Sequence, residues 1–205
     1  MKKIILLLAI CFTGLGFGQN DEGYVDELTL EFTKKLTERN ITNYYTVKRY
    51  CSGTIEMFKL PERICTSKGT YFEVYVVWKE EDGAFIKKID NCSLYYSVPL
   101  SDNKLHEFFI SNLTTLKSGE IKNYKSATYT GKPELRKKPQ PCFRSFQFTN
   151  GETTFFKSYN LFDISNDSDG KNLNYEFNSQ LKVVILDAML DAVLAVSEEK
   201  MKRQI

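Results

Sequence analysis

The sequence contains little histidine, no excess of charge of one sign, no Cys-x-x-Cys motif and no long apolar run. Of its 205 residues, 28 are basic, 26 are acidic and one is a histidine. Nucleic-acid-binding proteins carry a basic excess gathered on one face, and this balance of charge does not indicate one. The longest apolar stretch, Ile4 to Phe12, is short of the about 20 residues that a transmembrane helix needs. We therefore expect no nucleic-acid partner and no transmembrane segment in the mature chain.

The N-terminus has the three-part layout of a secretory signal peptide. A start with two lysines precedes the apolar run, and small residues follow up to Gly18. We predict cleavage after Gly18 and export to the periplasm or the exterior, because the short leader is typical of bacterial exported proteins. A lipoprotein anchored through Cys11 is disfavoured, since the bulky Ile10 stands where a small residue is needed. Removal of residues 1–18 takes away two lysines and no acid, so the mature chain has a formal net charge of zero.

The cysteines are too widely spaced for the usual zinc and redox motifs. Without Cys-x-x-Cys, a tetrahedral zinc site and a thioredoxin-type pair have little support. The only histidine, His106, has no sequence relation to a cysteine that would indicate a catalytic pair. The even number of cysteines that remains after export predicts disulfides instead. We predict Cys51–Cys65 as a local link and Cys92–Cys142 as a link between two β-hairpins, and we expect no cofactor.

Two stretches predict β-hairpins. Tyr71 to Trp78 alternates in the period-two pattern of a buried strand, and Ala84 to Ile89 returns as its partner. Cys142 to Phe156 contains Asn150-Gly151, a dipeptide that predicts a tight turn because both residues tolerate positive φ angles. Further strands are predicted at Ile41 to Tyr50, Thr54 to Leu60 and Cys92 to Pro99.

Three stretches have the apolar periodicity of helices: Asp21 to Asn40, Ser101 to Lys117 and Phe177 to Lys200. Taken with the strands, this order predicts a single α+β domain over residues 19–205. We expect a mostly antiparallel sheet of about six or seven strands, packed against an N-terminal, a central and a long C-terminal helix.

Candidate catalytic side chains lie on two of the expected helices. Asp187 and Asp191 are one helical turn apart, which is the spacing of a carboxylate pair for acid–base work. The same spacing suits the solvated edge of a helix that lies on the sheet, and this interpretation is favoured. His106 has the usual pKa of a general base, but its place beside an apolar stripe is better explained as a boundary residue of the central helix.

Residues 165–176 have the spacing of an EF-hand calcium loop, with Asp167, Asp169 and Glu176 at ligand positions. The match is incomplete, because the first position is the uncharged Ser165 and a strand-like segment precedes the loop. A polar turn is therefore favoured over a metal site. The proline- and lysine-containing run 131–141 predicts an extended, exposed loop, with docking to an anionic envelope polymer as the weaker alternative.

No stretch of the chain carries a chemistry-specific motif. We therefore predict an exported, non-catalytic protein that binds a partner protein or a component of the cell envelope. The alternative is a carboxylate-dependent hydrolase of the periplasm or the exterior, which requires Asp187 and Asp191 in a concave pocket.

Overall fold

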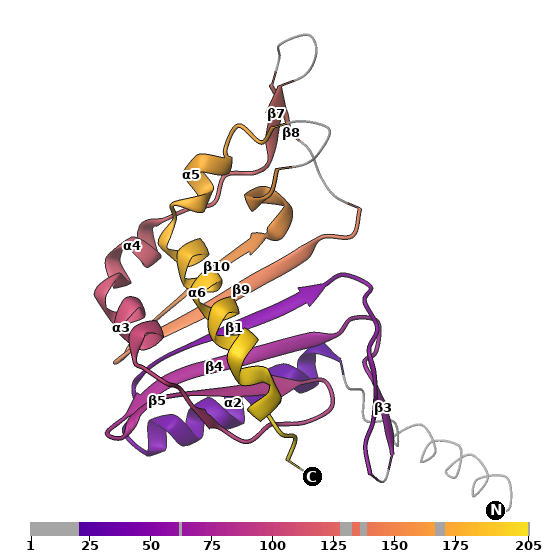
Figure 1. Ribbon diagram of the computed structural model, residues 1–205, viewed down its shortest axis with the longest axis vertical. Helices are drawn as coiled ribbons and strands as arrows, with labels where there is room; N and C mark the ends of the chain where they lie inside the picture. Colours follow the sequence, from indigo (N-terminus) through magenta and orange to yellow (C-terminus); the bar gives the residue numbers. More distant parts are fainter. Residues whose placement is uncertain (1–20, 62, 128–132, 136–138, 167–170, 205) are drawn as a thin grey trace, which may run out of the picture.

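The fold is a six-stranded antiparallel sheet with helices on both faces (Figure 1). The computed structural model describes residues 21–61, 63–127, 133–135, 139–166 and 171–204, so the predicted signal peptide lies outside the described residues. The sheet consists of β1 (Asn43–Cys51), β4 (Phe72–Glu80), β5 (Gly83–Asp90), β6 (Val98–Pro99), β9 (Cys142–Asn150) and β10 (Thr153–Asn160). Its strand order is β10-β9-β1-β4-β5-β6. The predicted α+β class is confirmed.

Strand β4 separates two hydrophobic clusters, one on each face of the sheet. Phe72, Val74, Val76 and Trp78 pack into one cluster, while Tyr75 and Val77 belong to the other. Burial on both faces explains why this strand is rich in large apolar and aromatic residues. The predicted hairpin with β5 is confirmed, and Glu80 pairs with Gly83 at its turn.

Helix α2 (Glu22–Glu38) covers one face of the sheet over β4 and β5. Asp21 caps its first turn, because the Asp21 carboxylate accepts a hydrogen bond from the Tyr24 N–H at 3.2 Å. Val25 and Leu36 are fully buried against the sheet. This helix matches the predicted stretch closely.

The opposite face is covered by α3 (Lys104–Ser111), α4 (Leu113–Ser118) and α6 (Lys182–Ser197). The predicted central helix is two helices, because Asn112 ends the first and its side-chain amide donates to the Phe108 carbonyl at 2.8 Å. The predicted start of the C-terminal helix at Phe177 is also wrong. A separate short helix, α5 (Tyr175–Ser179), precedes α6, and the buried Asn178 side chain instead binds the backbone of Lys122 and Asp163.

The turn between β9 and β10 lies one residue later than predicted. Asn150 pairs with Thr153 inside the ladder, so the two loop residues are Gly151 and Glu152. Gly151 has a φ of 60°, which is the first central position of a type II′ hairpin turn.

Two short hairpins extend from the sheet. One joins β2 (Met57–Lys59) to β3 (Ile64–Thr66), and the other joins β7 (Lys125–Ala127) to β8 (Pro133–Leu135). Two short 3-10 helices lie at Leu161–Ile164 and Glu198–Lys200. Of the predicted strand from Cys92 to Pro99, only the last two residues form β6, although Leu94 makes a single bridge to Ile89. Within the described ranges, no helix has the length and apolarity needed to cross a bilayer.

Two disulfides are present, but the predicted pairing is wrong. Cys51 ends β1 directly opposite Cys142, which begins β9, and these two cysteines are bonded. Cys65 of β3 is bonded to Cys92, which follows β5. The prediction failed because it assumed that Cys51 meets the loop nearest in sequence. In the sheet, β1 lies between β4 and β9, and it is β9 that places a cysteine, 91 residues further along the chain, beside Cys51.

Candidate functional site

A row of polar side chains crosses the face of the sheet that α6 covers. Tyr159, Arg144, Arg49, Glu73 and Asp90 stand opposite one another on β10, β9, β1, β4 and β5. Adjacent arginines repel each other, so Arg49 and Arg144 need carboxylates close to them. Helix α6 supplies them.

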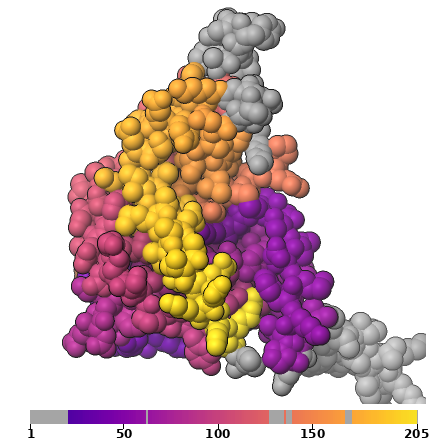
Figure 2. Space-filling model, viewed as in Figure 1, coloured from indigo at the N-terminus to yellow at the C-terminus, as the bar shows by residue number. Residues whose placement is uncertain are grey.

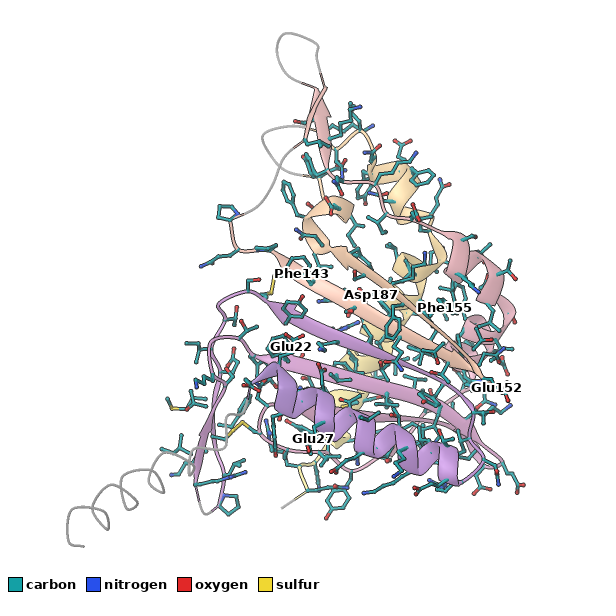
Figure 3. All side chains as sticks on the ribbon, turned by 180° about the vertical axis from the view of Figure 1, so that it is seen from behind. Glu22, Glu27, Phe143, Glu152, Phe155 and Asp187 are labelled. Carbon is teal, nitrogen blue, oxygen red and sulfur yellow. A yellow bond between two sulfur atoms is a disulfide. The ribbon has the colours of Figure 1, made fainter. Side chains whose placement is uncertain are left out.

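Asp187 lies over both arginines and is buried, with 6% of its side chain exposed. Its carboxylate is 2.5 Å from Nη2 of Arg49 and 3.1 Å from Nε of Arg144. It also accepts a hydrogen bond from the Tyr159 hydroxyl at 2.7 Å. Asp191 contacts Nη1 of Arg49 at 2.6 Å and stays 57% exposed. The predicted solvated edge is therefore wrong for Asp187, which points into the molecule (Figure 3).

The charges of this cluster stabilise one another. Burial alone would lower the pKa of Arg49, but the carboxylates of Asp187 and Asp191 raise it above its usual value. Burial raises the pKa of Tyr159 far above its usual range, and the Asp187 charge adds to this shift. Because the Asp187 oxygens already accept from three side chains, this carboxylate is a buried ion-pair partner and has little capacity left to take a proton from a substrate.

A second buried carboxylate, Asp90, holds the C-terminal segment against β5. Asp90 is fully buried, and Arg203 binds both of its oxygens at 2.9 and 2.7 Å. The hydroxyls of Tyr71 and Tyr95 donate to it at 2.9 and 3.0 Å. Such a bidentate, fully satisfied pair fixes one arrangement of the chain end.

Lys87 is a buried lysine on the other face of β5, with 3% of its surface exposed. Its ammonium donates to the Tyr95 carbonyl and lies 5.0 Å from the centre of the Phe32 ring. Among the described residues, no carboxylate forms an ion pair with it. Burial lowers the pKa of Lys87 to about 8, and the nearby Lys35 charge adds to the effect.

We expect Lys87→Met to raise the free energy of unfolding by roughly 1–3 kcal/mol at pH 7, because it removes a buried, unpaired charge. A folded-state pKa below the unfolded one means that the cost of the charge is present at neutral pH. That cost disappears as the pH rises from about 8, the pKa of Lys87 in the folded state, to about 10.5, its pKa in the unfolded chain. Urea unfolding at pH 7 and pH 10 should therefore show the advantage of the variant shrinking with pH. Lys88→Met is the control, and it should destabilise at pH 7 because Lys88 is paired with Glu73.

His106 is buried where α3 meets β1. Its Nε2 lies 3.2 Å from the Asn43 carbonyl, and its ring meets Phe109 edge-on at 5.9 Å. Burial lowers the pKa of His106. A shallow, open depression of about 770 Å³ adjoins it, lined also by Lys79, Glu80 and Asp82. His106 is more deeply buried than the boundary position that the sequence predicts. Its contact with the Asn43 carbonyl links α3 to β1.

The structure neither supports nor contradicts the calcium loop. Asp167 and Asp169 lie outside the described residues, as do residues 131–132 and 136–138 of the run 131–141, so both interpretations stay predictions. Glu176 pairs with Lys171 at 3.2 Å on the surface. Across the ranges that the structure covers, no cluster of three or more His, Cys, Asp or Glu side chains is placed to hold a metal ion. Asn172, which occupies a usually apolar loop position, is buried and binds the carbonyls of Asp163 and Ser165.

The half of the sheet formed by β9 and β10 is uncovered on the face that carries α2. We call this surface the open face. In the described part of the chain, α2 lies over β4 and β5 and no helix lies over β9 and β10 on this side (Figure 3). Its residues follow from the strand alternation and are uncharged: Phe143, Ser145, Gln147, Thr149, Thr154, Phe156, Ser158 and Asn160.

A groove of about 230 Å³ runs between α2 and the open face. Leu30 of α2 and Phe156 of β10 line it, and they are 69% and 67% exposed. Thr46 and Gln147 form part of its floor, and Lys48 contributes a cation that is held by Glu22 at 2.8 Å and Asp26 at 2.6 Å. The only sequence signal of this surface is the alternation of polar residues with Phe146 and Phe148 along β9.

Comparisons of this chain with protein-family models, curated proteins and solved structures find no match. The function must therefore be argued from the residues of the sites themselves.

Proposed function

We propose that this chain is an exported, non-catalytic protein that binds a partner protein or a component of the cell envelope on its open face. One observation carries the proposal. Among the described residues, no helix covers β9 and β10 on the face that carries α2, and exposed Leu30 and Phe156 flank the groove at the boundary. Two exposed large apolar side chains lining one groove favour a surface that is covered in a complex.

The composition of the open face supports this role. The cores of protein interfaces are depleted in charged residues and enriched in aromatic ones. The open face has Phe143 and Phe156 among serine, threonine, asparagine and glutamine side chains, and it has no charged residue. Phe143 stacks on Tyr50 at 5.2 Å, so part of the aromatic surface is already held in place. A neutral, extended ligand or a flat protein surface suits it best.

Export is supported by the predicted signal peptide and by the two disulfides, which persist in oxidising compartments. A carboxylate-dependent hydrolase has less support, because Asp187 is engaged by Arg49, Arg144 and Tyr159. Its neighbour Asp191 is exposed and paired with the same Arg49. The two carboxylates therefore have different surroundings and one shared structural partner.

Photo-cross-linking in the native host tests the proposal. We expect a photoreactive residue at Phe156 or Ser158 to form one defined adduct, because both positions lie on the surface that the partner would cover. A probe at Val196, which is 70% exposed on α6, is the control and should give none. The adduct should disappear when Gln147→Arg adds a further cation to the groove. Absence of an adduct at both open-face positions, or an equal adduct at Val196, would contradict the proposal.

A further inference from the structure

We propose that the β2–β3 hairpin docks the protein on the surface of an anionic lipid membrane. This hairpin extends from the sheet beside the end of the C-terminal segment (Figure 2). We call residues 54–68 the arm, apart from the undescribed residue 62. The proposal concerns the side of the arm that points away from the body of the protein. It does not depend on the open face.

The register of the arm sorts its side chains onto two sides. Phe58 pairs with Cys65, and both point toward the body, where Cys65 is bonded to Cys92. Met57 pairs with Thr66, and Lys59 with Ile64, and these four point outward. Just outside the strands, Ile55 and Lys68 are also exposed, and we group them with these four. The outward face therefore consists of Ile55, Met57, Lys59, Ile64, Thr66 and Lys68.

The outward face combines exposed aliphatic side chains with cations. Ile55, Met57 and Ile64 are 59%, 66% and 66% exposed. Lys59 and Lys68 are exposed, and no salt bridge involves them within the described ranges. Glu56 is exposed as well, and as the neighbour of Met57 it alternates onto the other side of the strand. Aliphatic side chains with lysines at their margin are the composition of surfaces that lie in a membrane interface, where the ammonium groups reach the headgroups.

The arm is held rigidly enough to present this face. The Cys65–Cys92 disulfide fixes β3 to the residues that follow β5. The Phe58 ring lies 5.4 Å from the ring of Tyr71, and the Arg203 guanidinium lies 4.2 Å from the Phe58 ring. Since Arg203 is itself bound by Asp90, the inward side is fixed by a disulfide, ring contacts and a buried ion pair. Little conformational entropy is then lost when the outward face binds.

Charge and size select the membrane over other occupants. A second copy of the chain would bring lysines against lysines, which is unfavourable. A stable protein interface involves roughly 20–30 residues on each side, and the outward face has six. A lipid surface needs no matching shape, and it rewards both buried aliphatic groups and basic residues near anionic headgroups.

Vesicle co-sedimentation of the full mature chain tests the proposal. We expect binding to vesicles that contain phosphatidylglycerol, weak or no binding to pure phosphatidylcholine vesicles, and loss of binding as salt increases. Lys59→Gln and Lys68→Gln should each weaken binding about five-fold. Met57→Ser and Ile64→Ser should each weaken it on the order of ten-fold, and all four variants should keep the parent melting temperature because these side chains are exposed.

Two matched controls separate this proposal from the proposed function. Lys117→Gln removes an exposed lysine from α4, and Phe156→Ser removes an equally exposed apolar side chain from the open face. Both should bind vesicles like the parent chain, while Phe156→Ser alone should impair the partner adduct. Equal binding to neutral vesicles, arm variants that bind normally, or sedimentation analysis that shows an arm-dependent dimer would each overturn the membrane assignment.

Discussion

Asp187→Ala should lower the free energy of unfolding by about 3–5 kcal/mol, the cost of removing one partner from a buried ion pair. The carboxylate of Asp187 compensates Arg49 and Arg144, which stand opposite each other on adjacent strands and are mostly buried. Without it, Arg144 has the Phe143 carbonyl as its remaining described partner, and the Tyr159 hydroxyl loses its acceptor. An ordinary domain is stable by about 5–15 kcal/mol, so this single change would remove a large part of the total.

Asp191→Ala is the matched control for this prediction. It removes the same side chain from the same helix one turn later, and it also breaks a contact to Arg49. Because Asp191 is 57% exposed, we expect a loss of less than about 1 kcal/mol. Urea unfolding of the two variants, followed by circular dichroism, provides the comparison. Equal losses would show that the burial of Asp187 does not determine its contribution.

The second large effect is expected from the disulfides. In the chain-entropy model, the Cys51–Cys142 bond closes 91 residues and contributes about 4.5 kcal/mol, while the Cys65–Cys92 bond closes 27 residues and contributes about 3.5 kcal/mol. Both are upper-end figures, because measured disulfides often contribute less. We therefore expect the double variant Cys51→Ser, Cys142→Ser to unfold at lower denaturant than Cys65→Ser, Cys92→Ser.

Non-reducing peptide mapping checks the pairing on which this order depends. The map should contain a peptide that joins Cys51 to Cys142 and another that joins Cys65 to Cys92. A peptide that joins Cys51 to Cys65 would contradict the strand order as well as the pairing, because it would separate Cys51 from its partner across β1 and β9. Free thiols at all four positions would remove the main chemical support for export.

Local patterns of the sequence determined the class of the fold and most of its elements. The pattern in Tyr71 to Trp78 was sufficient because a strand buried on both faces carries large apolar or aromatic side chains at nearly every step, with Glu73 as the exception. The N-terminal helix was predictable because its apolar residues recur with the helical period along nearly its whole length. These signals are short-range, and each depends on residues that are within a few positions of one another.

The tertiary structure alone decided which distant residues meet. The pairing of β1 with β9 places Cys51 opposite Cys142 and Arg49 opposite Arg144, and no local pattern specifies which strands become neighbours. The same pairing turns Asp187 from an expected surface residue into a buried counter-ion, because two arginines on adjacent strands need a shared carboxylate. The open face arises in the same way. Its residues alternate as the sequence indicates, but their exposure follows from a helix that covers β4 and β5 and ends short of β9 and β10.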